Sequence, residues 1–324
     1  MINEARFNLR SWTSNSEKVR ILAEHENVLD KDEFTKVLGM RWDHKKDELL
    51  YPEKEETISI LVTKREILRY SSKIYDPLGF LSPVTIRAKI LLQELWKLGS
   101  DWDTPLEGNI YTDWIYLKKD IKEATQTTFP RYYFTGTCKN YSDGLELHVF
   151  VDASVKAYGA VAYVCKGKDS SIVMAKTRVA PLKELTLPQL ELMAAVVGAR
   201  LAQHIRSTLD CKTITMWSDS QIVLHWLKSS KTLKRFISNR VKEIQTITRS
   251  SIWRYCPTSD NPADLLTRGI TIEQYKSSIM WRNGPHWLTD MSIYPNALSV
   301  ETTLSTFETD KTKTSQTNLN PCRN

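Results

Sequence analysis

The fold of this chain is decided by residues 145–164, which read LELHVFVDASVKAYGAVAYV. In the first half, apolar residues from Leu145 to Val151 alternate with Glu146, His148, Phe150 and Asp152. Such period-two alternation predicts a strand with one face on a core. A turn through ASVKAYG follows, and the apolar run 160–164 predicts a second, neighbouring strand. Asp152 at the mouth of the turn is either a turn cap or a ligand for a hard cation, and for a single Asp the cap is the stronger interpretation.

Regular strands and helices continue downstream. Further strands are predicted around 172–179, 213–218 and 252–256, and helices over 188–208, 220–227, 233–247 and 261–267. Pro188 stands near the start of the longest helix, a position that prolines favour. Three antiparallel strands, a crossover helix and a strand–helix–strand–helix order predict a mixed α/β sheet with helices on both faces. We expect the strands 145–152 and 213–218 to be parallel neighbours.

The chain before residue 142 is less regular. FNLRSWTSNS and KVLGMRWDHKKDELLY look like strand pieces with no partner strand before them, so we expect the chain to begin inside a domain. Residues 58–96 are predicted to be helical on both sides of SKIYDPLGFLSP, where two prolines and a glycine interrupt the helix. After about Asn296 the chain is rich in Ser, Thr and Asn without periodicity, which predicts a disordered tail.

Composition limits the classes of protein to consider. The 324 residues are 41% hydrophobic and 26% charged, which is typical of a globular protein of about two domains. The net charge of +7 suits a polyanionic partner, although solvated basic faces are common. Five scattered cysteines without a CxxC pair predict neither a disulfide framework nor a zinc site, and favour a reducing intracellular compartment. No apolar run approaches the roughly 18 residues of a membrane span, and no signal peptide is recognisable.

Three further acids accompany Asp152 in the α/β unit. Glu191 lies at the edge of a helix's apolar stripe, where a carboxylate is costly unless it is paired or binds a metal. Asp219 ends the strand ITMWSD just before a helix, and Asp264 opens the last short helix, where the helix dipole favours an acid. Each acid alone has an ordinary structural explanation.

Together the four acids indicate a metal site. In open α/β sheets, sites gather beyond the carboxyl ends of the strands. Four oxygen ligands without an accompanying His or Cys favour Mg²⁺ or Mn²⁺. Two such ions about 4 Å apart activate water and stabilise the leaving oxygen in phosphodiester hydrolysis.

The blocks that contain these acids resemble the ribonuclease H domain of retroelement reverse transcriptases, in the variety found in the BEL/Pao group of long-terminal-repeat retrotransposons. They are VFVDASVKAYGAV, LTLPQLELMAA, WSDSQIVLHWL and NPADLLTRG. In that family each block supplies one metal-binding acid, and the resemblance assigns these catalytic roles to Asp152, Glu191, Asp219 and Asp264. FNLRSWTSN, KVLGMRW, YSSKIYDPLGFLSPVTIRAKILLQELW and GPHWL are also similar to that group's Pol polyprotein. The resemblance covers about residues 7–288.

The resemblance implies a ribonuclease H-like mixed five-stranded sheet with flanking helices, preceded by a partial reverse transcriptase segment. We expect a palm-end, thumb and connection remnant over 1–141, the ribonuclease H-like domain over 142–270, a linker segment with GPHWL over 271–295 and a disordered tail over 296–324. The polymerase motif YxDD is absent, so no polymerase activity is expected. In a full-length element the partners would include the remaining Pol domains, polymerase and integrase.

The implied activity is endonucleolytic cleavage of RNA in RNA–DNA hybrids, with two Mg²⁺ or Mn²⁺ ions, in a cytoplasmic retroelement particle or in the nucleus. The alternative is a decayed retrotransposon fragment that folds partly, or binds nucleic acid, without turnover. The loop CPTSDNP before the last acid lacks the His that many ribonucleases H carry there, which puts fast product release in doubt.

Two related activities fit the sequence less well. The word peptidase has been attached to this part of the BEL/Pao polyprotein, but an aspartic peptidase needs an Asp-Thr-Gly or Asp-Ser-Gly loop and none occurs. Integrases share the fold, but a Glu on the helix between the third and fourth strands fits ribonuclease H better.

A basic helix over 233–247, with the turn before it, is a candidate surface for the phosphates of a hybrid. The basic residues are Lys228, Lys231, Lys234, Arg235, Arg240 and Lys242. An A-form-like hybrid would be recognised through its backbone and 2′-hydroxyls rather than its base edges. A solvated amphipathic face explains the same residues equally well.

Overall fold

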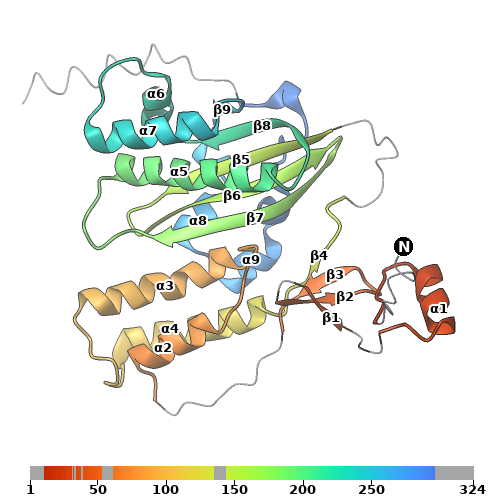
Figure 1. Ribbon diagram of the computed structural model, residues 1–324. Helices are drawn as coiled ribbons and strands as arrows, with labels where there is room; N and C mark the ends of the chain where they lie inside the picture. The colour runs from red at the N-terminus through yellow and green to blue at the C-terminus, as the bar shows by residue number, and fades with distance from the viewer. Residues whose placement is uncertain are drawn as a thin grey trace, which may run out of the picture. The chain divides into compact units, whose positions relative to one another are not determined.

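The structure, a computed structural model, describes residues 11–30, 32, 34–37, 39–52, 61–134 and 144–295 (Figure 1). The tail expected to be disordered, 296–324, and the beginning of the FNLRSWTSN block lie outside the described residues. The described strands form two sheets, one of four strands and one of five. None of the described helices is long and apolar enough to cross a membrane.

The five-stranded sheet has the order β7-β6-β5-β8-β9. Its strands are β5 (Leu145–Ala153), β6 (Ala157–Lys166), β7 (Asp169–Val179), β8 (Cys211–Ser218) and β9 (Ile252–Tyr255). The first three strands along the chain pair antiparallel, whereas β8 runs parallel to β5 and β9 parallel to β8. The predicted mixed sheet is therefore confirmed, and so is the parallel pairing of the strands that end near the first and third acids.

Helices cover both faces of this sheet (Figure 1). Helices α5 (Leu187–Arg206), α6 (Gln221–Lys228) and α7 (Arg235–Ile247) lie on one side, and α5 packs on β5 and β6. Gly198 permits that close packing, because a Cβ there would lie 2.3 Å from Cγ1 of Val151. On the other side, α8 (Asp264–Arg268) contacts β5 and β6, and helix α3 (Ser82–Lys97) contacts β7.

Strand β5 is buried on both faces, which goes beyond the prediction of one core face. Leu147, Val149 and Val151 belong to the hydrophobic cluster under α5. Phe150, which points the other way, belongs to a second cluster and is fully buried. The alternation in the sequence was therefore interpreted correctly as a strand, but its second face meets another core rather than solvent.

The residues before the five-stranded sheet form a small sheet and a group of helices. Helix α1 (Glu17–His25) precedes the antiparallel sheet of β1 (Phe34–Val37), β2 (Met40–Asp43), β3 (Glu48–Leu50) and β4 (Phe129–Pro130). Within the predicted stretch KVLGMRWDHKKDELLY, β2 and β3 pair with each other. The described part of FNLRSWTSNS forms no named strand and contributes only an isolated bridge between Trp12 and Leu29. Helices α2 (Lys64–Ser72) and α4 (Gly108–Ala124) pack on α3, and the predicted helix break separates α2 from α3.

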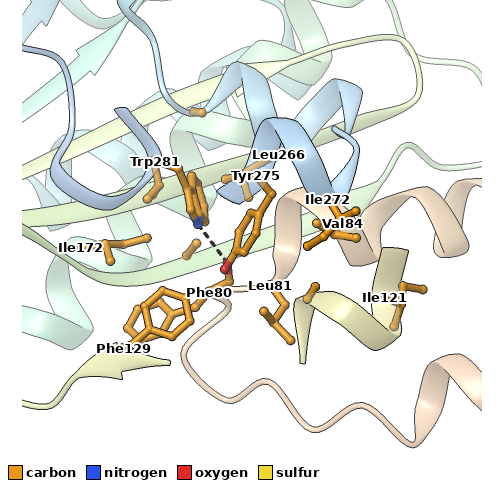
Figure 2. Packing of buried hydrophobic residues seen from close by; sticks show 14 of the residues in the cluster. Phe80, Leu81, Val84, Ile121, Phe129, Ile172, Leu266, Ile272, Tyr275 and Trp281 are labelled. Atoms are coloured by element: carbon orange, nitrogen blue, oxygen red, sulfur yellow. Dashed lines mark hydrogen bonds between the residues drawn. The ribbon is translucent and has the colours of Figure 1, made fainter. Parts of the chain in front are cut away.

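The second hydrophobic cluster joins this helical group to the large sheet (Figure 2). It unites Val84 of α3 and Ile121 of α4 with Leu266 of α8. Tyr275 of α9 (Ile272–Ser277) and Trp281 of α10 (Ile279–Asn283) are also buried in it, and both donate hydrogen bonds to the carbonyl of Phe80. The segment expected as a linker therefore contributes helices to a shared core. The domain boundaries at 141/142 and 270/271 stay predictions.

Candidate active site

Two of the four predicted acids lie at the carboxyl ends of adjacent parallel strands. Val151 of β5 is the register partner of Ser218 of β8, so the next residues along the two strands are Asp152 and Asp219. Because parallel strands end at the same edge of a sheet, both carboxylates belong to one edge. The negative charge of Asp219 contributes to raising the pKa of Asp152, as expected for neighbouring acids.

The carboxyl group of Asp152 is almost fully enclosed. The residue is 7% exposed, and the hydroxyl of Thr267 donates a hydrogen bond of 2.5 Å to its Oδ2. Burial, followed by the charge of Asp219 and then that of Asp264, raises the pKa of Asp152 to about 7, against the hydrogen bond from Thr267. This acid therefore changes charge near neutral pH, and a nearby cation would favour its ionised form.

Glu191 is the fifth residue of α5, just after the first turn of the helix. Its Oε2 accepts a hydrogen bond of 2.6 Å from the hydroxyl of Ser220, the residue that precedes α6. The same hydroxyl accepts a hydrogen bond from the backbone N–H of Val223 and so caps α6. Burial and the charge of Asp219 raise the pKa of Glu191. Ser220 therefore couples the carboxylate on α5 to the beginning of α6.

Asp219 is held by the loop that precedes the last acid. The hydroxyl of Thr258, in the 3-10 helix η1 (Thr258–Asp260), donates a hydrogen bond of 2.9 Å to Oδ2 of Asp219. Burial raises the pKa of Asp219, hydrogen bonds from Thr258 and Asn261 oppose the rise, and the charge of Asp264 adds to it. Asn261 is fully buried, and its side-chain amide donates to the carbonyl of Val151, which fixes the loop against β5.

Asp264 is the first residue of α8 and is partly exposed. Its side chain is 25% exposed, and its Oδ1 lies 2.6 Å from Nε of Arg268 one turn later. Its charge raises the pKa of both Asp152 and Asp219, so the helix brings it close to the two strand-end acids. All four predicted acids are thus linked through electrostatic interactions at one end of the sheet.

The four acids offer oxygen ligands of the type that hard divalent cations take, although they are not arranged around a common point. Among the residues that the structure describes, no three His, Cys, Asp or Glu side chains are already arranged to hold a metal ion. Glu191 and Asp264 are instead held by Ser220 and Arg268. The set nevertheless offers carboxylate oxygens alone, which suit Mg²⁺ or Mn²⁺. Burial and mutual repulsion raise the pKa of three of the acids, and a cation would relieve that repulsion.

Sequence reasoning missed the side chains that hold the acids in place. They are Ser220, Thr258, Asn261, Thr267 and Arg268. All except Thr258 stand within the sequence blocks that carry the acids, directly beside or within one helical turn of them. Their short distance in sequence from the acids could therefore have identified these residues. Thr258 instead lies in the loop CPTSDNP, which was considered in the sequence only because it lacks a His.

The predicted basic residues lie around the α6–α7 connection. Lys228, Lys231, Lys234, Arg235 and Lys242 are exposed, and within the described part of the chain no acid is recorded in an ion pair with them. Arg240 differs. Its Nε donates to Sδ of Met193 at 2.9 Å, and its guanidinium carbon lies 3.5 Å from the ring centre of Phe236. Arg240 is therefore engaged with α5 and its own helix. The role of these residues in nucleic-acid binding stays a prediction.

Several solved structures are similar to this chain. The N-terminal RNase H domain of Rv2228c from Mycobacterium tuberculosis, solved as a fusion with maltose binding protein, is 13% identical, with 41% of this chain and 96% of that chain covered and a TM-score of 0.32. LC11-RNase H1 in complex with an RNA/DNA hybrid is 14% identical, with 41% and 99% covered and a TM-score of 0.32. The foamy viral protease-reverse transcriptase in complex with an RNA/DNA hybrid is 11% identical, with 75% and 34% covered and a TM-score of 0.46.

The sequence comparisons match part of the chain to a known family of domains. No curated protein matches the chain. Residues 63–220 match the family model described as the Pao retrotransposon-like RNaseH-like domain. The match begins just before α2, includes the first three acids and ends before Asp264. The resemblance to the BEL/Pao polyprotein is confirmed over this stretch, which is just under half of the chain and is similar to a Pao retrotransposon-like, RNaseH-like domain.

Proposed function

We propose that this chain hydrolyses the RNA strand of RNA–DNA hybrids with two Mg²⁺ or Mn²⁺ ions held by Asp152, Glu191, Asp219 and Asp264. The observation that carries the proposal is the meeting of Asp152 and Asp219 at the ends of adjacent parallel strands. The charge of Asp264 raises the pKa of both acids, and the charge of Asp219 raises the pKa of Glu191. Burying several like charges together is unfavourable unless a cation compensates them. The RNaseH-like family of the domain supports the same chemistry.

The residues of the chain would prepare the site for these ions. The hydroxyls of Ser220, Thr258 and Thr267 each donate to one oxygen of one acid, which orients that carboxylate. Burial of Asp152 excludes water from the inner part of the site. When bound, the two ions would activate the attacking water and stabilise the leaving oxygen of the phosphodiester.

The proposed substrate is an RNA–DNA hybrid rather than a particular sequence. The exposed basic residues at the α6–α7 connection, such as Lys231 and Lys234, could neutralise phosphates of a hybrid whose shape and 2′-hydroxyls are recognised. In a full-length element, the polymerase and integrase parts of the Pol polyprotein would be the partners of this chain.

The test is cleavage by the purified chain of three duplexes labelled on one strand: an RNA–DNA hybrid, an RNA duplex and a DNA duplex. We expect only the RNA of the hybrid to be cut, with Mg²⁺ or Mn²⁺ and not with EDTA. Asp219→Asn should abolish cleavage, whereas Asp113→Asn, on the exposed face of α4, should not. Hybrid binding without cleavage by the parent chain would favour the non-enzymatic alternative.

A further inference from the structure

The helix that carries Asp264 is too short to be stable by itself. Helix α8 contains five residues, and isolated helices of this length do not persist in water. Its position must therefore come from its contacts. It also carries Thr267, whose hydroxyl donates to Asp152, so the position of α8 sets both Asp264 and the partner of Asp152.

The large sheet holds one side of α8. The hydroxyl of Thr177 on β7 donates to the carbonyl of Leu266, and the hydroxyl of Ser154, just after β5, donates to the carbonyl of Thr267. Leu266 itself is fully buried. These contacts come from the five-stranded sheet and involve the middle and end of the short helix.

The helical group before the sheet holds the other side. The backbone N–H of Ile270 donates to the carbonyl of Pro83 at 3.0 Å, and the carbonyl of Ile270 accepts a hydrogen bond of 3.2 Å from Nη1 of Arg87. Gly269, which lies between α8 and Ile270, has a φ of +77°, and a Cβ at this residue would lie 2.5 Å from Cγ of Arg87. The end of α8 thus packs directly on the Arg87 side chain of α3.

Arg87 is itself fixed from a third element. Nη1 also donates to Oδ2 of Asp120 on α4, and the side chains of Arg87 and Asp120 are only 28% and 12% exposed. The two hydrogens of one guanidinium nitrogen therefore serve a carboxylate on α4 and the carbonyl that follows α8. A planar guanidinium held by a carboxylate is a rigid donor, unlike a freely rotating surface cation.

We propose that Arg87, oriented by Asp120, is a positioning residue for the acidic site: it holds the end of α8 so that Asp264 and Thr267 stand beside Asp152. This inference rests on the proposed function for its catalytic meaning, but the holding of α8 can be tested independently. It implies that α3 and α4 contribute to the ribonuclease H-like site, although both helices end before the first strand of the five-stranded sheet begins at Leu145.

Hydrogen–deuterium exchange on the full chain tests the holding of α8. In Arg87→Gln, the amides of Gly269 and Ile270 should exchange at least about tenfold faster, because the contacts that protect them are loosened. The exchange rates of amides in the middle of β5 should change only as much as the global stability of the variant changes. The matched control is Arg65→Gln, which removes a bidentate pair with Asp103 elsewhere in the same helical group and should leave α8 unchanged.

Magnesium titrations test the consequence for the site. We expect Arg87→Gln to raise the Mg²⁺ concentration for half-maximal cleavage by about tenfold, a typical effect of losing a residue behind a metal ligand. The rise in melting temperature that Mg²⁺ produces should shrink in parallel. Arg87→Lys, which keeps a charged donor, should restore part of the parent chain's response to Mg²⁺. Asp120→Asn should change the response in the same direction as Arg87→Gln, but by less. Arg65→Gln should behave like the parent chain.

Unchanged exchange of Gly269 and Ile270 in Arg87→Gln and in Asp120→Asn would overturn the proposal, whatever the activity. A general loss of protection that is equal in Arg87→Gln and Arg65→Gln would overturn it too, because the effect would then be one of stability alone. Absence of cleavage by the parent chain would instead overturn the proposed function, and the exchange result would still decide whether Arg87 holds α8.

Discussion

Replacing Asp152 with Asn should stabilise the metal-free protein, and the gain should depend on pH. Asp152 is enclosed at the end of β5, where burial and then the charge of Asp219 raise its pKa from the ordinary value of 3.8 to about 7. Asn has nearly the same shape, and its Oδ1 can still accept the hydroxyl of Thr267. The substitution therefore removes a charge that burial and the neighbouring acids disfavour.

The magnitude follows from the shift in pKa. The folded state binds the proton of Asp152 more tightly than the unfolded state, so the acid lowers stability as pH rises from about 4 to about 7. Above about pH 7 both states are ionised, and a shift of about three units corresponds to about 4 kcal/mol. At about pH 5 the folded state keeps its proton, and the cost falls to about 1–2 kcal/mol. Below about pH 4 it disappears.

Urea denaturation in EDTA measures this difference directly. Asp152→Asn should be more stable than the parent by up to about 4 kcal/mol near pH 8, with a smaller gain near pH 5. Asp113→Asn, which removes an exposed charge from α4, should show no comparable pH-dependent gain. The reasoning is refuted if Asp152→Asn loses stability near pH 8, or if its gain is the same at both pH values.

Four further outcomes are expected. Asp219→Asn should abolish cleavage, weaken Mg²⁺ binding by calorimetry and slightly stabilise the metal-free protein, because burial and like charge raise the pKa of this acid; a loss of stability would make it a helix cap. Arg268→Gln should lower the Mg²⁺ concentration for half-maximal thermal stabilisation by up to about fivefold, since an exposed ion pair contributes at most about 1 kcal/mol. Gly198→Ala should cost about 1–3 kcal/mol in urea denaturation, because its Cβ would overlap Val151. Neutralising Lys234 should reduce the salt dependence of hybrid binding by about one counterion, and an unchanged slope would leave it a solvated surface residue.

Local sequence patterns were enough to predict the five-stranded sheet and the ends of two of its strands. Alternation around Phe150 and the apolar runs after each turn are properties of short segments, which a sequence displays directly. The neighbouring positions of Asp152 and Asp219 then followed from the parallel arrangement that a crossover helix imposes. This is why the edge where the acids gather could be expected before the structure.

The second core could not be predicted in this way. Residues 271–295 were expected to be a linker. Their helices α9 and α10 are only six and five residues long, too short to show a period in the sequence. Their partners are also remote in sequence: Tyr275 and Trp281 bind the carbonyl of Phe80, some 200 residues earlier. The contact of Arg87 with Ile270 spans a similar distance. Such pairings depend on the assembled fold and leave no local signal.

The hydroxyl partners of the acids form an intermediate case. Ser220 and Thr267 stand in the recognised blocks, so their closeness to the acids was visible, but which oxygen each would contact depends on the packing of α6 and α8. Sequence alone therefore proposed which acids form the site, and not the hydrogen bonds that orient them.

The most direct test of the central claim is the chemistry of the cut ends. The purified chain would be incubated with an end-labelled RNA–DNA hybrid and Mg²⁺, and the RNA fragments would be analysed for their terminal groups. Water activated by metal ions at the carboxylate site should leave a 5′-phosphate and a 3′-hydroxyl, and Asp152→Asn should leave the RNA intact. Fragments ending in a 2′,3′-cyclic phosphate, or cleavage that persists in EDTA or in Asp152→Asn, would contradict the account.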